Sequence, residues 1–460
     1  MYGSGSECKL EAVSGGTAMG GEFWVPDNPG HRVRGEFEAE YGSDAEVLLD
    51  QGLVDDPRVV RTPNGFGLIS SVEASVEAFQ PIVIFGHLDS GEMVTLHRAR
   101  NNGGHYPFGK PRYVADVCFT GAHLADTNQA FDAVRARIGH WAWLAHLRDG
   151  ESATVPDDKS TLRAALHEDG NWLEYISIEP VTLRQLEERV IYSCAVLVEL
   201  ATYCKVSTRE VELRIGGEGS DWISVHGSAV AAKTHEFSRY RRLLPSSELT
   251  VQIFAEWIAL NDTLDGLSAA VAHKNTGPLQ EAVLIVASLV EGLHRRLGYR
   301  QLRFPSTPKE DLRRIEKAAR QSAGTEAELL GNIDRRSSEN AVVFLREIGF
   351  RTRVADVVDE VCAVVPEIVE SVPDFTKLLY KARNELAHHS VADEQDDPFE
   401  VRVLRWIVAS TVTHWLLRCL LLLRAGIAPE TLRHHILEFQ RFQMFRANSA
   451  RHAKELGWEL

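Results

Sequence analysis

The chain has 460 residues, 44% of them apolar, and a formal net charge of −15. This length and composition indicate a globular protein of two or three domains, and the acidic balance argues against a protein that coats nucleic acid through phosphate neutralisation. The six cysteines lie far apart without a Cys-x-x-Cys pair, which argues against a disulfide framework or zinc knuckle and favours a reducing cytoplasm. No secretion signal is visible.

The first 180 residues predict a β-rich domain. Short β-branched and aromatic runs, separated by Gly, Pro, Asn and Asp, are typical of strands and occur at 32–40, 82–86, 94–97 and 113–119. Residues 131–147 are expected to form a helix or an aromatic-rich turn. A further strand pair is expected at 172–178 and 211–215, joined by a helix over 182–203, and residues 221–226 are expected to close the sheet.

From about residue 249 the apolar residues recur with the period of a helix. Helices are expected at 249–272, 279–297, 308–323, 338–348, 354–365, 375–389, 399–425 and 429–442. The apolar stretch 401–428 contains four arginines and a histidine, so we expect a buried bundle helix and no membrane span. The chain is therefore predicted to be an α+β multidomain protein, with a sandwich- or barrel-like β domain over 1–240 and an all-α bundle over 241–460.

The most informative motif is Arg383-Asn384-Glu385-Leu386-Ala387-His388, near the end of a predicted amphipathic helix. Asn384 and His388 are four residues apart and share a helix face, with Arg383 beside them. An acidic run over 393–397, followed by Pro398, predicts a loop after this helix. A guanidinium that grips phosphate bidentately, next to an imidazole that can move a proton, can cut RNA without a metal.

The form Arg-Asn-x-x-x-His within an all-helical domain resembles the catalytic signature of HEPN ribonucleases. The resemblance implies that Arg383 binds the scissile phosphate, that His388 is the general acid and base, and that Asn384 orients either group. His389 also satisfies the family spacing, but His388 matches the Arg-Asn-x-x-x-His form and shares the face of Asn384. A solvated helix end, with the histidine complementing the helix dipole, is the alternative.

An earlier helix adds a supporting candidate. HEPN domains often place an acidic residue there, which the resemblance assigns to Glu291; an ordinary helix-surface glutamate is the alternative. His294, Arg295 and Arg296 follow it and add positive charge that could track RNA, although a solvated helix face explains them equally well.

The front half resembles the N-terminal domain of ApeA-type abortive-infection proteins. The matching residues are Gly21-Glu22-Phe23-Trp24-Val25-Pro26, Val33-Arg34-Gly35-Glu36-Phe37, the run from Gly86 to Leu96, and Gly121-Ala122-His123-Leu124. Proteins of this family join a β-rich front domain to a C-terminal HEPN ribonuclease domain, and the two resemblances occur here in that order.

The combined resemblance implies a cytoplasmic anti-phage endoribonuclease that cleaves RNA by metal-independent transesterification, leaving a 2′,3′-cyclic phosphate. It further implies a homodimer through the HEPN domain, a phage-derived trigger sensed or relayed by the front domain, and tRNA as a substrate. No cofactor, metal or membrane partner is predicted. The alternatives are a non-catalytic HEPN module that binds RNA or protein, and a ligand-binding β-sandwich on a helical dimerisation domain.

Four histidines of the front domain are candidate metal ligands. His87, His97, His105 and His123 are 10, 8 and 18 residues apart, spacings that match no common zinc arrangement. The tryptophans of this half, Trp24, Trp141, Trp143 and Trp172, could stack on bases or sugars, but large aromatic residues in a β domain are usually core.

Overall fold

The computed structural model describes residues 18–39, 43–63, 65–68, 71–104, 107–126, 128–139, 144–167, 170–206, 208–227, 242–273, 277–331, 334–336, 347–387 and 397–458. The chain divides into two compact units. The first comprises Met1–Ala195 and Val206–Phe237, and the second comprises Val196–Lys205 and Ser238–Leu460. The division passes through helix α3 (Tyr192–Thr202), so the end of this helix belongs to the second unit.

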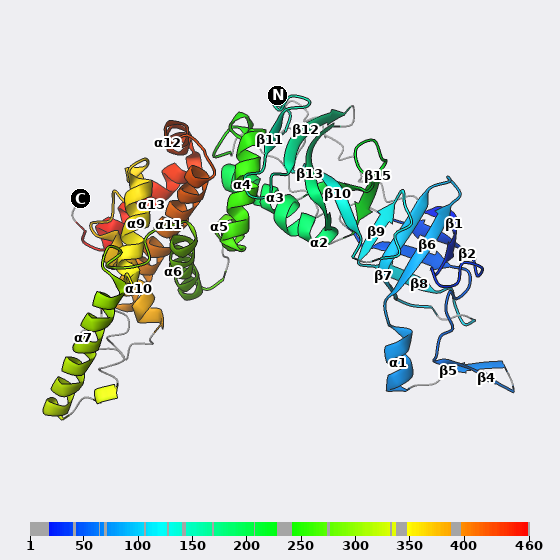
Figure 1. Ribbon diagram of the computed structural model, residues 1–460, viewed down its shortest axis with the longest axis horizontal. Coiled ribbons are helices and arrows are strands. Elements are labelled where there is room, and N and C mark those ends of the chain that lie inside the picture. Colours follow the sequence, from blue (N-terminus) through cyan, green and yellow to red (C-terminus); the bar gives the residue numbers. More distant parts are fainter. Residues whose placement is uncertain are drawn as a thin grey trace, which may run out of the picture. The chain divides into compact units, whose positions relative to one another are not determined.

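The N-terminal part of the first unit forms a closed six-stranded barrel (Figure 1). All its neighbouring pairs are antiparallel, and the barrel is closed where Arg100 and Asn101 pair with Val114 and Tyr113. The strands run round it in the order β6 (Ile82–Leu88), β1 (Met19–Trp24), β2 (Val33–Glu38), β3 (Ala45–Leu49), β8 (Arg112–Ala115) and β7 (Met93–Asn101).

The barrel interior is filled by every second side chain of its strands. Phe23, Phe37, Ile84 and Leu96 are fully buried, whereas alternate residues of the same strands face outward. Gly86 lies against two of the large core side chains: a Cβ at this position would lie 2.5 Å from atoms of Phe23 and of Val94. The glycine therefore permits the close strand packing that the interior needs.

The sheet continues beyond β7 through seven further strands. In sheet order these are β9 (Val117–Thr120), β15 (Trp222–His226), β14 (Thr208–Arg214), β10 (Ala130–Ile138), β13 (Gly170–Thr182), β12 (Thr161–His167) and β11 (Ser152–Thr154). Near the barrel, β4 (Val59–Thr62) and β5 (Gly65–Leu68) form a separate hairpin, followed by α1 (Val72–Ala78).

Strand β10 corrects the expectation of a helix or turn over 131–147. Val134, Ala136 and Ile138 are buried and alternate with the more exposed Arg135 and Arg137, a period of two that favours a strand. β10 also lies between β13 and β14, so the predicted strand pair is separated by a third strand. The predicted helix over 182–203 is confirmed as α2 (Leu183–Leu186), a π-helical turn (Glu187–Ile191) and α3.

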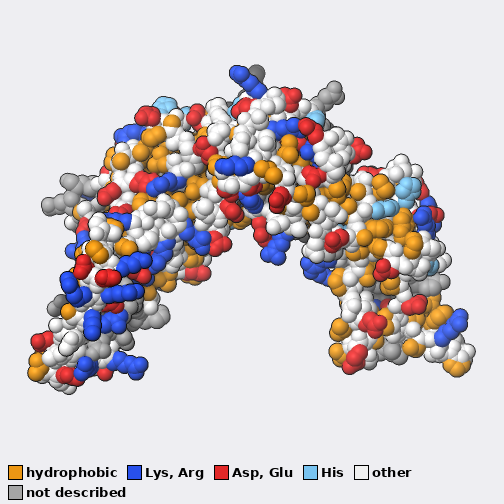
Figure 2. All heavy atoms as spheres, in the orientation of Figure 1, with side chains coloured by type: hydrophobic (Ala, Val, Ile, Leu, Met, Phe, Trp, Pro, Cys, Tyr) orange, Lys and Arg blue, Asp and Glu red, His pale blue; other side chains and the backbone are white. Residues whose placement is uncertain are grey.

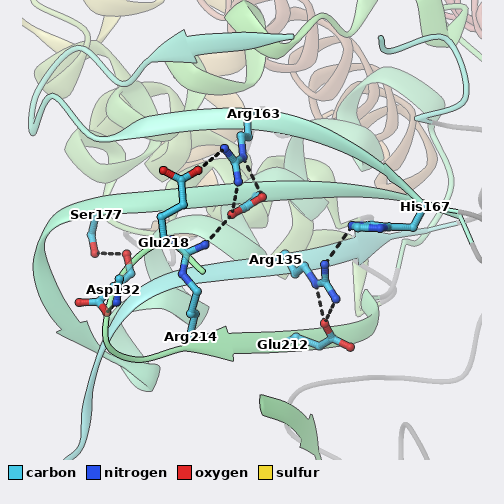
Figure 3. Close-up of polar contacts among 10 residues, drawn as sticks. Asp132, Arg135, Arg163, His167, Ser177, Glu212, Arg214 and Glu218 are labelled. Atoms are coloured by element: carbon cyan, nitrogen blue, oxygen red, sulfur yellow. Dashed lines mark hydrogen bonds and ion pairs between the residues drawn. The ribbon is translucent and has the colours of Figure 1, made fainter. Parts of the chain in front are cut away.

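One face of this second part of the sheet carries a stack of arginines and tryptophans. The Arg135 guanidinium carbon lies 4.7 Å from the ring centre of Trp172 and 4.5 Å from that of Trp222. The guanidinium carbon of Arg137 lies 4.3 Å from the ring centre of Trp172, and that of Arg214 lies 5.1 Å from the ring centre of Trp222. Trp172, considered earlier as a base-stacking residue, is thus occupied by protein cations. Figure 3 draws the polar contacts around this stack: Arg135 contacts His167 and Glu212, and nearby Arg163 contacts Glu218.

The second unit is helical in all but its short connecting segments, as far as the structure describes it. Its helices are α4 (Val251–Leu264), α5 (Leu267–Ala272), α6 (Leu279–Arg296), α7 (Lys309–Leu330), α9 (Phe350–Cys362), α10 (Phe375–Ala387), α11 (Phe399–Arg424), α12 (Pro429–Glu438) and α13 (Gln440–Glu455). The predicted helix over 249–272 is broken because Asp265 and Gly266 take positive φ values of 52° and 80°. The predicted helix over 338–348 lies largely outside the described residues. Figure 2 shows basic side chains gathered over α7.

Helix α11 is the core of this unit, and α5, α6, α9, α10, α12 and α13 all pack against it. It is long and apolar enough to cross a membrane, but 72% of its most apolar window is buried in the structure. Burial of that kind is expected of a bundle core helix.

Arg418 is a fully buried cation in the C-terminal half of α11. Its guanidinium donates hydrogen bonds to the backbone carbonyls of Glu199 (2.9 Å) and Leu200 (2.7 Å) near the end of α3, and to that of Ala272 (3.0 Å) at the end of α5. It also lies 4.4 Å from the ring centre of Tyr203. Burial lowers the pKa of Arg418 to about 10, so the group is still charged at neutral pH.

We expect Arg418→Met to destabilise the second unit strongly. The substitution leaves the Leu200 and Ala272 carbonyls without this donor, and each unsatisfied group costs about 1–3 kcal/mol. The Glu199 carbonyl keeps its hydrogen bond from the Tyr203 backbone N–H (2.9 Å). A loss of about 3 kcal/mol would lower the melting temperature by roughly 6–12 °C in a unit of this size. Arg446→Met is the control, because Arg446 pairs with Glu370 at 2.7 Å near the surface and should cost under about 1 kcal/mol. Equal shifts in calorimetry would contradict the structural role of Arg418.

Candidate active site

Helix α10 presents Arg383 and Asn384 in its last turns. Phe375, Leu378, Leu379 and Ala382 form its buried stripe, as the apolar spacing predicts. The Asp374 carboxylate accepts a hydrogen bond from the backbone N–H of Lys377 (2.9 Å) and caps the first turn. The described part of the helix ends at Ala387, so His388 and His389 lie outside the described residues.

Arg383 is partly exposed and has no close carboxylate among the described residues. Its side chain is 34% exposed, and its nearest carboxylate oxygen belongs to Glu291, 4.0 Å from Nη2. Nη1 donates a long hydrogen bond of 3.4 Å to the Asn384 Oδ1. The guanidinium carbon lies 4.9 Å from the ring centre of Phe350. Among the described residues, a ring and an amide therefore hold this guanidinium without a closely paired carboxylate.

Glu291 lies on α6, 92 residues before Arg383, and the structure brings the two side chains together. Its carboxylate also accepts a 3.0 Å contact from Arg295, one turn later on the same helix. Arg295 lies 3.5 Å from Glu347, which lies 3.9 Å from Arg353. The five side chains thus form an alternating line of charge, with Arg353 at one end and Arg383 at the other.

The three cations considered after Glu291 are separated in the structure. His294 is fully buried, and Arg295 faces Glu291. Arg296 turns to the end of α4, where it donates to the Thr263 carbonyl (3.0 Å) and pairs with Asp265 (2.8 Å). Of the three, only Arg295 therefore contacts Glu291, the residue next to Arg383.

A buried polar network lies behind Arg295. Arg353 is fully buried and donates from Nη1 to the His294 Nδ1 (3.1 Å) and to the Gln301 Oε1 (2.6 Å). The His294 Nε2 lies 3.0 Å from Asp356, and the ring stacks on Tyr299 with centres 4.6 Å apart. Arginine can only donate, so Nδ1 accepts and Nε2 carries the proton toward Asp356. Burial lowers the pKa of His294, which keeps the ring neutral near pH 7.

The structure adds Arg353, Asp356, Glu347 and Phe350 to the surroundings of the sequence-predicted residues. Only Arg353 had a usable signal, because it shares the stripe of Val357 and Val361 on α9, where a charged residue is unexpected. The contacts of Glu347 and Phe350 depend on tertiary packing and leave no local pattern.

Comparison with known protein families bears on this site directly. Residues 19–169 match the model of the ApeA N-terminal domain 1, and residues 284–431 match that of the Apea-like HEPN domain. The chain is an ApeA-like abortive-infection protein. The HEPN match includes Glu291, Arg383 and Asn384. No curated protein and no solved structure matches the chain significantly.

A cleft of the HEPN domain lies on the opposite side of α10 from Arg383. It is lined by Lys377, Lys381, Glu385 and, from α11 and the end of the chain, Arg405 and Trp458. Lys381 and Arg383 are two residues apart, which places their side chains about 200° apart around the helix. This cleft is therefore not the surface on which Arg383 and Glu291 meet.

One group of side chains in the described part of the ApeA-like chain has the spacing of metal ligands. His434, His435 and Glu438 on α12 place one possible ligand atom each within 4.8 Å of one another. In the front domain, His97 Nε2 lies 2.6 Å from the Leu124 carbonyl and His123 Nε2 lies 2.9 Å from the Gly86 carbonyl. These two rings make backbone hydrogen bonds, and His105 lies outside the described residues.

We expect the HEPN unit to lose stability as pH falls. Because burial lowers the folded-state pKa of His294, the unfolded chain binds the proton more readily below about pH 6.5. The contribution is therefore present above that pH and is lost as pH falls toward the folded-state pKa. His294→Gln can still accept from Arg353 and donate to Asp356 but cannot titrate, so its melting temperature should fall less than that of the wild type between pH 7.5 and 5. His434→Gln, exposed on α12, is the control, and an identical pH dependence of wild type and His294→Gln would contradict this role.

Proposed function

We propose that this ApeA-like protein is an anti-phage endoribonuclease whose HEPN domain cleaves RNA without a metal. The observation that carries the proposal is the state of Arg383, a partly exposed guanidinium 4.0 Å from its nearest described carboxylate. A phosphate is the complementary ligand for such a group, because it can accept two parallel hydrogen bonds from the guanidinium fork. The HEPN family match and the Arg-Asn-x-x-x-His motif support the same reading.

The proposed reaction is an in-line transesterification. The ribose 2′-oxygen attacks the adjacent phosphorus and gives its proton to a base, while the bond to the 5′-oxygen breaks and that oxygen receives a proton. The products are a 2′,3′-cyclic phosphate and a 5′-hydroxyl. Arg383 stabilises the charge on the phosphorane, and His388 moves the protons. Asn384 orients Arg383, and Glu291 supports the site from α6.

The biological setting belongs to the same proposal. The enzyme acts in the cytoplasm, and the β-rich front domain senses or relays a phage-derived trigger that releases activity. A tRNA is the proposed substrate, because one cut in an anticodon loop is enough to halt translation.

We expect Arg383→Ala to lower kcat/KM for RNA by about 10²–10³-fold, since a single preorganised donor to a developing anion has that effect. Arg383→Lys should recover only part of the loss, because an ammonium cannot bind phosphate bidentately. Purified full-length protein would be incubated with total bacterial RNA in EDTA, and the ends mapped for 2′,3′-cyclic phosphates. Cleavage that needs a divalent metal, or that survives Arg383→Ala, would contradict the mechanism.

His388→Ala should abolish the same cleavage, whereas His389→Ala should retain it. The two variants are matched controls for each other, because they remove the same ring from adjacent positions. Loss of activity in His389→Ala alone would transfer the acid–base role to His389.

We also expect a homodimer formed through the HEPN domain. One arginine and one histidine per chain are few groups for phosphodiester chemistry, and a twofold axis would bring two sets to one cleft. Light scattering after gel filtration should give twice the 51.3 kDa of one chain. A monomer at micromolar concentration with full activity would contradict the shared cleft.

A further inference from the structure

Two guanidinium groups compete for one carboxylate in the candidate site. Glu291 lies 3.0 Å from Arg295 and 4.0 Å from Arg383. The first distance is that of a hydrogen-bonded ion pair, whereas the second is too long for a hydrogen bond and is at the limit of an ion pair. Glu291 therefore binds Arg295, and Arg383 retains its charge.

We propose that Arg295 is a positioning residue that holds the Glu291 carboxylate away from Arg383 and thereby keeps Arg383 available for a phosphodiester. The inference rests on the proposed function for the identity of the anion. Arg295 lies outside the Arg-Asn-x-x-x-His motif. The proposed role explains why Glu291 lies closer to Arg295 than to Arg383.

Arg295 has three geometric advantages over Arg383 in this competition. It lies one turn after Glu291 on the same helix, the favourable order for an acid–base pair four residues apart. Its Nη2, which contacts Glu291, also lies 3.5 Å from Glu347, a second carboxylate that holds this guanidinium in place. The preceding residue, His294, is fully buried and bonded to Arg353, so this turn of α6 is anchored.

Arg383 is held by weaker partners that leave its charge in place. The ring of Phe350 and the Asn384 side chain orient the guanidinium without neutralising it. If Arg295 were removed, Arg383 would remain as the described cation within 4.0 Å of Glu291. The carboxylate could then rotate into a bidentate pair with Arg383 and occupy the donors that a phosphate needs.

The experiment is a double-mutant cycle with Arg295→Ala and Glu291→Gln. Glutamine keeps the size of Glu291 and one acceptor oxygen but lacks the charge that would trap Arg383. Arg296→Ala is the matched control, because it removes the adjacent arginine, which is tied to Thr263 and Asp265. Two quantities are measured for the full-length proteins: kcat/KM on RNA, and the affinity for a fluorescent 2′-O-methyl RNA that cannot be cleaved. Circular dichroism melting checks that each variant is folded.

We expect Arg295→Ala to lower both quantities at least tenfold, and Arg296→Ala to change them less than threefold. In the Glu291→Gln background, Arg295→Ala should cost less than threefold, because no carboxylate remains to be restrained. Equal costs in the two backgrounds would overturn the inference and point to direct contact between Arg295 and RNA. A cost of Arg295→Ala no larger than that of Arg296→Ala would also overturn it.

The two readouts separate this inference from the proposed function. If the wild type cleaves RNA but the cycle shows no coupling, the inference fails and the function stands. If the wild type binds the uncleavable RNA with the expected coupling but never cleaves, the positioning role stands and the ribonuclease proposal fails. If it neither cleaves nor binds RNA, both fail.

Discussion

The burial of Arg418 constrains the whole second unit. A guanidinium in the core must be charged and hydrogen-bonded, and here its recorded hydrogen-bond partners are backbone carbonyls at the ends of α3 and α5. The C-terminal ends of helices carry partial negative charge, so two of them can compensate a cation without a carboxylate. The last turns of α3 and α5 must therefore meet at Arg418, in the C-terminal half of α11. Helices α6, α9 and α10, which bear the candidate site, pack on the same helix. The position of α11 therefore also determines where these three helices lie.

Arg383 represents the opposite solution to the same electrostatic problem. Arg418 is buried and donates three hydrogen bonds to backbone carbonyls, whereas Arg383, among the described residues, contacts a ring, an amide and a distant carboxylate. Stability alone would favour a close pair between Arg383 and Glu291. A cation without a close carboxylate partner reduces local stability. Proteins often accept such a loss at functional sites and offset it with stabilising contacts elsewhere. Here the support is the buried network of Arg353, His294 and Asp356 behind α6.

The sequence predicts the local elements better than the long-range contacts. The change from strand to helix periodicity separates the β-rich and helical halves, and the stripe of α10 is correctly expected. The barrel closure depends on pairing between β7 and β8, which no local pattern encodes. β10 was misread because its aromatic-rich continuation outweighed the alternation of Val134, Arg135, Ala136 and Arg137. The proximity of Glu291 to Arg383 was expected only through the family resemblance, since packing brings them together.

The charge balance of the chain explains why such an arrangement would matter for the proposed RNA substrate. A net charge of −15 repels a polyanion, and at physiological ionic strength salt largely screens this repulsion beyond about 8 Å. The line from Arg353 to Arg383 contains three arginines and two glutamates, so it carries one positive charge in excess. That excess is useful only if it resides at the exposed end. The pairing of Glu291 with Arg295 places it there, on Arg383, and so allows an acidic protein to bind a phosphate at one point through short-range contacts.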